Sequence, residues 1–198
     1  MSKFMSKRIA FLSAAAFGAL VLTAAVVAPA NAQDKMMKSE MSGEKTVMVG
    51  GAAMFPSKNI IQNAVNSKDH TTLVAAVKAA GLVETLEGKG PFTVFAPTNT
   101  AFGKLPAGTV DTLVKPESKP TLTKILTYHV VPGRLEASSL TDGKKLKTVE
   151  GEELTVKKSG GKVMIVDAKG GSSTITIPNV NQSNGVIHVV DTVLMPAS

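Results

Sequence analysis

The sequence contains no cysteine and no tryptophan, only one tyrosine, and aromatic residues make up 4% of its 198 positions. Without cysteine there is no disulfide bridge and no thiolate metal site, so a folded domain must depend on its apolar core. The scarcity of aromatic side chains argues against nucleic acid as a partner, because single strands are commonly bound by stacking on aromatic rings.

Motifs typical of catalysis are absent as well. The sequence has no G-x-S-x-G elbow, no G-x-x-x-x-G-K-[ST] phosphate loop and no G-x-G-x-x-G. The three histidines are not spaced like the zinc ligands of H-E-x-x-H. We therefore predict a protein that is not an enzyme and has no catalytic residue, no cofactor and no metal site.

Residues 1–32 have the composition of a signal peptide. Basic residues at the start precede an apolar run over 9–27, and Ala30-Asn31-Ala32 matches a small-residue cleavage site. The run is long enough to approach a membrane span, so a retained anchor is the alternative. Cleavage predicts a secreted or periplasmic protein. Because no cysteine is available for a lipid and the C-terminus is not an apolar tail, we expect no stable membrane anchor afterwards.

Residues 33–46 are polar and charged, which indicates a flexible leader. Methionines are frequent here and just beyond, and thioethers suit Cu(I), so a copper-binding leader is one interpretation. Irregular spacing favours the other, a disordered leader followed by core methionines at Met48 and Met54. Residues 33–198 carry 19 basic and 15 acidic residues, a net charge of +4.

The order of predicted elements indicates the α+β class. Apolar residues at helical spacing predict early helices, and alternating residues predict late strands. The expected helices are Ser57–Val65, Thr71–Ala80 ending at Gly81, one after Pro106 through Leu113, and one from about Pro120. The expected strands are 154–156 and 163–166, joined by a glycine turn, then 173–177 stopping at Pro178, and 186–194.

A buried strand is also predicted over Phe92–Phe95. It is bounded by Gly90-Pro91 and by Pro97, which cannot donate to a ladder. Thr98 then stands at the N-cap of a short helix, which places Ala101 and Phe102 toward the core.

Three segments carry a family resemblance: GPFTVFAPTNTAF at 90–102, LTYHVVPG at 126–133 and NGVIHVVDTVLMP at 184–196. In this order they closely resemble the two signature boxes and the central Tyr-His pair of the fasciclin (FAS1) domain, an extracellular adhesion module. The resemblance runs from about Val47 to Pro196 and implies one FAS1 domain over 47–198. It implies a wedge of β-strands packed against several short α-helices, and a non-catalytic role in adhesion or in binding proteins or matrix.

Tyr128 and His129 are the candidate partner-binding residues. In animal relatives of the family, the stretch around this pair is implicated in integrin-type adhesion, and a structural histidine is the alternative. His129 shares the apolar face of its helix with Leu122, Ile125 and Leu126, whereas Tyr128 is turned about 100° away. The pattern predicts that His129→Ala mainly destabilises, and that Tyr128→Ala weakens binding with little loss of stability.

The other two histidines are given structural or surface roles. His188 and Asp191 are three residues apart on a strand and therefore point to opposite faces, which argues against a shared metal. By resemblance, polar groups of this strand tie down neighbouring turns. His70, next to Asp69, is predicted to be an ordinary surface residue at the start of a helix.

Basic residues gather at 144–147 and 157–158. They favour either a solvated face or contact with anionic polymers. The expected partners are thus a cell-surface or matrix protein or an anionic polysaccharide, with the oligomeric state open. The alternative function is a periplasmic carrier or sensor of a small ligand or metal, such as copper or haem, held by methionine and histidine.

Overall fold

A computed structural model describes residues 45–197 of the chain. The predicted signal peptide (1–32), its alternative as a retained anchor, and all but the end of the predicted leader (33–46) lie outside the described residues. Within the described range, no helix is both long and apolar enough to cross a membrane.

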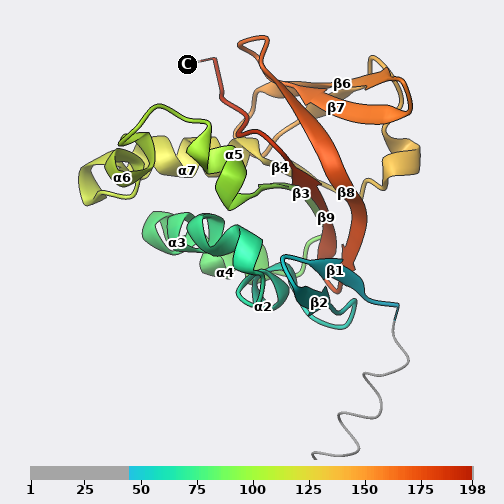
Figure 1. Ribbon diagram of the computed structural model, residues 1–198, viewed down its shortest axis with the longest axis horizontal. Helices are drawn as coiled ribbons and strands as arrows, with labels where there is room; N and C mark the ends of the chain where they lie inside the picture. The colour runs from blue at the N-terminus through green and yellow to red at the C-terminus, as the bar shows by residue number, and fades with distance from the viewer. Residues whose placement is uncertain (1–44, 198) are drawn as a thin grey trace, which may run out of the picture. The chain divides into compact units, whose positions relative to one another are not determined.

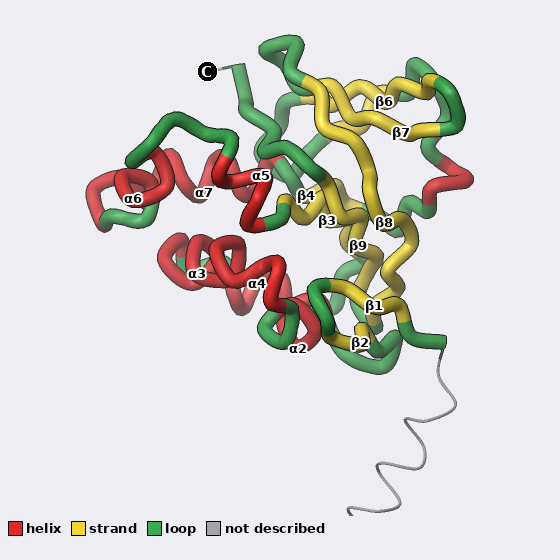
Figure 2. Tube along the Cα trace, viewed as in Figure 1, coloured by secondary structure: helices red, strands yellow, loops and turns green. Residues whose placement is uncertain are grey.

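The main sheet has seven strands in the order β4-β3-β9-β8-β7-β6-β5. Only β3 and β9 pair in parallel, and the other neighbours are antiparallel. The strands, yellow in Figure 2, are β3 (Phe92–Pro97), β4 (Val130–Pro132), β5 (Lys145–Lys147), β6 (Glu153–Ser159), β7 (Lys162–Val166), β8 (Ser172–Gln182) and β9 (Gly185–Val190). A separate hairpin is formed by β1 (Val47–Val49) and β2 (Ala52–Met54).

The helices are short and gather on one side of β3 and β9 (Figure 1). They are α2 (Ile60–Ala64), α3 (Thr71–Ala80), α4 (Val83–Glu87), α5 (Asn99–Gly103), α6 (Thr109–Leu113) and α7 (Lys119–Tyr128), with 3-10 turns η2 (Lys68–His70), η3 (Pro116–Ser118) and η4 (Ala137–Ser139). Strands packed against segregated helices confirm the α+β class.

Three helix limits follow from capping chemistry that is visible in the sequence: the start of α2, the end of α3 and the start of α5. α3 ends at Gly81, which adopts a left-handed φ of 74° as a C-cap glycine does. Thr98 caps α5 by accepting a hydrogen bond from the Ala101 amide at 3.2 Å. The predicted N-cap at Ser57 is wrong, because Asn59 is the N-cap: it forms a reciprocal capping box with Gln62, and α2 begins at Ile60.

The strand limits that differ most from the prediction are the ends of β8 and β9. β8 continues through Pro178 to Gln182, because irregular register between Ile177 and Val180 removes the proline from the regular ladder. At this irregularity Asn179 has a φ of 56°, and its side chain accepts a hydrogen bond from the Ala137 amide at 2.7 Å. β9 ends at Val190, four residues before the predicted end.

Both faces of the central strands are buried, in two separate apolar clusters. Val94 and Ala96 of β3 face the helices in the first cluster, whereas Phe95 belongs to the second. The first cluster unites the helices with β3 and β9. The second lies among the strands and contains Phe95, Tyr128, Val131, Leu140, Leu146, Leu154, Val156, Ile165, Val190 and Leu194. Met54 is buried as predicted, but Met48 is 59% exposed, so its predicted place in the core is wrong.

Candidate functional site

Tyr128 ends α7 and is fully buried in the second cluster. Its hydroxyl accepts a hydrogen bond from the Ala168 amide at 2.9 Å and donates to the Glu153 carbonyl at 3.3 Å. Burial raises the pKa of the phenol. The side chain therefore ties α7 to β6 and to the turn after β7.

His129 follows directly and is fixed through both ring nitrogens. The Leu194 amide can only donate, so its 3.0 Å contact makes Nε2 an acceptor. The proton then lies on Nδ1, which donates to the Ile125 carbonyl at 2.8 Å. Burial lowers the pKa of His129 to about 4, so the ring is neutral near pH 7.

The direct contact of Tyr128 and His129 with a partner stays a prediction, and the structure gives both side chains other tasks. Neither is exposed by more than 2%. A partner reaches the pair only through the surface around it or after local opening. The expected effect of Tyr128→Ala changes accordingly, from little loss of stability to a large one.

His188 and Asp191 occupy separate hydrogen-bond networks, in agreement with their predicted opposite faces. His188 stacks on Phe95 with ring centroids 5.7 Å apart, and its Nε2 lies 2.7 Å from the Leu135 carbonyl. Asp191 accepts a hydrogen bond from the Thr174 amide at 2.8 Å. These contacts join β9 to neighbouring turns and strands. Among residues 45–197, no cluster of His, Asp and Glu is arranged to hold a metal ion.

His70 is buried, with 4% of its surface exposed, so its predicted surface position is wrong. His70 ends the η2 turn, and the Ser67 hydroxyl lies 2.9 Å from its Nδ1. No hydrogen bond from the described residues reaches Nε2. Burial lowers the pKa of His70, an effect that the Ala96 backbone and Asp69 offset in part.

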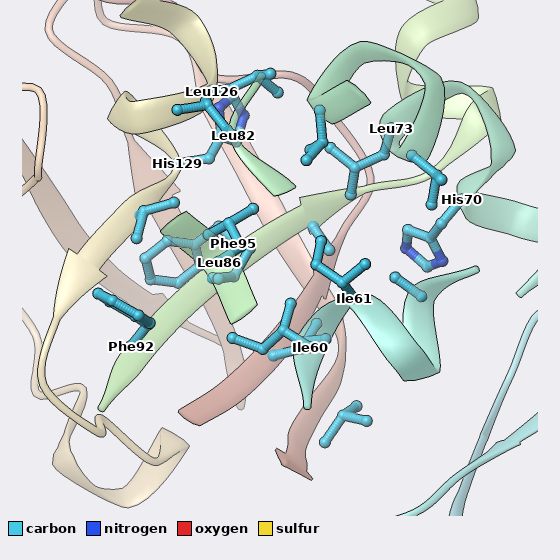
Figure 3. A pocket seen from close by; sticks show the side chains of 18 of the residues that line it. Ile60, Ile61, His70, Leu73, Leu82, Leu86, Phe92, Phe95, Leu126 and His129 are labelled. Carbon is cyan, nitrogen blue, oxygen red and sulfur yellow. The ribbon is translucent and has the colours of Figure 1, made fainter. Parts of the chain in front are cut away.

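The ring of His70 borders an apolar cavity of about 80 Å³ between β3 and the helices. Figure 3 shows the cavity from close by, with Ile60 and Ile61 of α2, Leu73 of α3 and Leu126 of α7 around it. A cavity of this kind has no signature in the sequence, because its lining comes from helices and strands that are far apart along the chain.

Asn184, in the turn between β8 and β9, is a further key residue, one for which the sequence pattern predicts no role. Its Oδ1 accepts from the Ile60 amide at 3.1 Å, and its Nδ2 donates to the carbonyls of Leu86 and Gly88 at 2.7 and 2.9 Å. One buried side chain thus holds α2, α4 and the β8–β9 turn together. Its position in an NG turn is the only sequence signal.

We expect Asn184→Ala to lower the free energy of unfolding by about 3 kcal/mol, because three backbone groups lose their partner. Urea unfolding followed by far-UV circular dichroism measures this. Asn66→Ala is the matched control, since Asn66 is exposed and its side chain donates to the nearby Gln62 carbonyl; it should cost less than about 1 kcal/mol. Equal losses in both variants would contradict the bridging role.

Lysines project from the outer face of the β5–β6–β7 sheet. Leu146, Leu154 and Val156 point into the second cluster, so their neighbours in the strands point to solvent. We call Lys145, Lys147 and Lys157 the lysine face. Lys145 pairs with Glu153 at 3.3 Å, whereas no ion pair of the described residues involves the other two.

Comparisons with known proteins agree on one family. The family model described as Fasciclin domain matches residues 68–196. Protein sll1483 of Synechocystis sp. is 50% identical over 153 residues, which cover 77% of this chain and 82% of that protein. Immunogenic protein MPT70 of Mycobacterium tuberculosis is 34% identical over 195 residues, covering 95% and 96% of the two chains.

Cell surface glycolipoprotein MPB83 of Mycobacterium bovis is 35% identical over 181 residues, covering 89% of this chain and 78% of that protein. Among solved structures, a FAS1 domain pair from the insect cell adhesion molecule Fasciclin I matches with a TM-score of 0.64 at 17% identity. That match covers 77% of this chain and 58% of the insect chain, and it supports the fold.

Proposed function

Because the chain belongs to the fasciclin (FAS1) domain family, we propose that it is an exported, non-catalytic binding protein. Its partner is an acidic one, a cell-surface or matrix protein or an anionic polysaccharide, and it attaches through the lysine face. Similarity to a cell surface glycolipoprotein over 89% of the chain supports a place outside the cytoplasm. Similarity of fold to an insect cell adhesion molecule supports binding as the task.

The lysine face is proposed because buried and exposed residues alternate along β5 and β6. Residues of one parity are buried in the second cluster, so those of the other parity stand together on a rigid, exposed sheet. Among the described residues, Lys147 and Lys157 form no ion pair with an acidic side chain, so little favourable pairing must be broken when a partner binds. A sheet also holds charges at fixed spacing, which favours a partner with regularly clustered negative charge.

Lysines on an edge strand have a second use, because they discourage pairing of the exposed edge with another chain. β5 is such an edge. This use predicts that removal of the lysines promotes aggregation and leaves partner binding unchanged. The two roles are therefore separable by experiment.

We expect Lys145→Gln, Lys147→Gln and Lys157→Gln together to weaken binding to heparin, used as an anionic polymer, by about tenfold at low salt. The weakening should shrink as salt screens the charges. The control triple Lys78→Gln, Lys89→Gln and Lys115→Gln changes the net charge equally at exposed positions outside this sheet. Equal weakening by both triples would mean that only net charge matters, and would contradict a defined face.

A second function, the binding of a small ligand, is favoured by one observation, the apolar cavity of about 80 Å³ between β3 and the helices. For copper or haem in particular, the described residues offer little support. His129 and His188 use both ring nitrogens in hydrogen bonds. The methionines at 36, 37 and 41 lie outside the described residues.

A further inference from the structure

We propose that the segment after β9, residues 194–197, is an acid-sensitive latch: it leaves the domain when His129 takes up a proton, while the sheet and the helices stay folded. We call residues Leu194–Ala197 the latch. Its release opens the protein beside Tyr128 and His129, the pair that is buried when the latch is closed.

The latch is held by three backbone amides, and each of them donates to an ionisable side chain. These hydrogen bonds run from Leu194 to Nε2 of His129 at 3.0 Å, from Met195 to Oδ2 of Asp167 at 3.0 Å, and from Ala197 to Oε2 of Glu152 at 2.8 Å. The remaining residue, Pro196, has no amide proton. Among the described residues, no hydrogen bond between two backbone groups supplements these three. The attachment of the latch therefore depends on the protonation of its acceptors.

The latch lies outside the sheet and can separate from it. β9 ends at Val190, so the latch has no strand neighbour and no ladder to break. Leu194 is fully buried in the second cluster, whereas Ala197 is exposed. Segments with few backbone hydrogen bonds open at a lower free energy than the central strands of a domain. We therefore expect local release of the latch before the domain unfolds.

His129 is the acceptor that protonation changes most. In its neutral form Nδ1 donates to the Ile125 carbonyl, and Nε2 accepts from the Leu194 amide. The imidazolium carries a proton on both nitrogens, so Nε2 becomes a donor that faces the Leu194 N–H. A protonated carboxyl group keeps an oxygen that accepts, so Asp167 and Glu152 lose only the charge that strengthens their hydrogen bonds.

The direction of the pH effect follows from the burial of the ring. Burial lowers the pKa of His129 to about 4, an effect that the Ile125 backbone and Asp167 offset in part. When the latch leaves, water reaches Nε2 and the pKa returns toward its ordinary value of about 6.5. The released form therefore binds the proton more tightly, and acid favours it. The ratio of released to closed protein should rise about twentyfold from pH 7 to pH 5 and about a hundredfold from pH 7 to pH 4.

The charged groups around His129 and the latch are mostly acidic. Asp167 is the charged group whose field acts on His129, and Glu150 and Glu152 act with it on the adjacent Tyr128 hydroxyl. The basic groups near the latch are Lys124, which pairs with Glu150 at 3.5 Å, Lys104, which pairs with Asp191 at 3.9 Å, and Lys145 and Lys147, which border the same surface hollow as Ala197. The field on the ring thus favours the imidazolium once the latch opens.

The test is hydrogen exchange of backbone amides, followed by two-dimensional NMR on the full chain between pH 7 and pH 4. Each rate is divided by that of an unstructured chain, which gives the opening constant of each amide. We expect the opening constants of the Leu194 and Met195 amides to rise about twentyfold from pH 7 to pH 5 and about a hundredfold from pH 7 to pH 4. Amides of β9 should open at least about a hundredfold less often at every pH.

Two variants assign the effect to one side chain. His129→Gln keeps a carbonyl that accepts from the Leu194 amide but does not titrate, so the rise between pH 7 and pH 5 should shrink to less than about twofold. Glu152→Gln is the matched control, because it replaces another titrating acceptor of the latch with an amide. It should keep the wild-type rise between pH 7 and pH 5 within about twofold.

The latch is disproved if its amides and those of β9 share one opening constant at every pH, or if the opening constant changes less than about threefold between pH 7 and pH 5. A folded His129→Gln variant that keeps the wild-type rise would also disprove it. If that variant does not fold, the wild-type rise above pH 5 decides, since carboxyl groups ordinarily titrate below about pH 5. No acidic partner is present in these measurements, so their outcome is independent of binding at the lysine face.

Discussion

Replacement of Tyr128 by alanine is expected to lower the free energy of unfolding by about 4 kcal/mol or more. Truncation of a buried aromatic side chain typically costs about 3–5 kcal/mol, through lost apolar contacts and the cavity left behind. Here the Ala168 amide also loses the hydroxyl that accepts its hydrogen bond at 2.9 Å. Because the chain has no tryptophan and no other tyrosine, unfolding in urea should be followed by far-UV circular dichroism.

Tyr128→Phe is the matched control, since it keeps the ring and removes only the hydroxyl. We expect it to cost about 1–2 kcal/mol. If Tyr128→Ala unfolds at the wild-type urea concentration but binds its partner less well, the side chain is a recognition group, and its place in the second cluster is wrong. If Tyr128→Phe costs as much as the alanine variant, the hydroxyl is more important than the packing.

Acidification from pH 7 to pH 4 is expected to destabilise the protein through its buried histidines. In the unfolded chain each histidine has a pKa near about 6.5. In the folded protein burial lowers the pKa of His129 to about 4, and it lowers the pKa of His70 and His188 as well. Below about pH 6.5 the unfolded state therefore binds more protons than the folded state, so the free energy of unfolding decreases as the pH is lowered.

The contribution of the neutral histidines to the free energy of unfolding is complete above about pH 6.5 and is lost as the pH falls toward about 4. For His129 alone the loss is about 3 kcal/mol. Urea midpoints measured between pH 8 and pH 4 give the number of protons taken up on unfolding. NMR titration of the histidine rings supplies the control for carboxylates that also titrate at the acid end. A His129 resonance that titrates near pH 6.5 in the folded protein would contradict its burial.

Local chemistry explains why much of the fold is predictable from the sequence. The end of α3 at Gly81, the cap of α5 at Thr98 and the glycine turn between β6 and β7 depend on residues within a few positions of each other. The strand end predicted at Pro178 was wrong for the opposite reason. Its effect on β8 depends on an irregular register with β9, and that pairing is not local.

The candidate sites depend on contacts that are remote in the sequence, and they were harder to predict. An apolar stripe on α7 correctly placed His129 in the core, but the helix is buried on two sides. Its Leu122 and Ile125 face the first cluster, and Tyr128 faces the second. The η2 turn that carries His70 is held by Asn99 of α5, which donates to the Lys68 carbonyl at 2.8 Å, and no apolar periodicity predicts this contact.

Asn184 illustrates the same limit. Its three partners lie near residues 60 and 86–88, about a hundred positions away, and no spacing rule connects them. The NG turn is visible in the sequence, whereas the bridge from that turn to α2 and α4 exists only in the folded domain.

Site-specific photo-crosslinking on intact cells that export this fasciclin-domain protein shows whether it attaches to an acidic partner through the lysine face. A photoreactive residue is placed at Lys157 on β6, or at the exposed Thr112 of α6 as the distant position. We expect covalent adducts with an acidic surface component from position 157, absent from position 112 and suppressed by added heparin. Adducts from position 112 alone, or equal adducts from both, would contradict it.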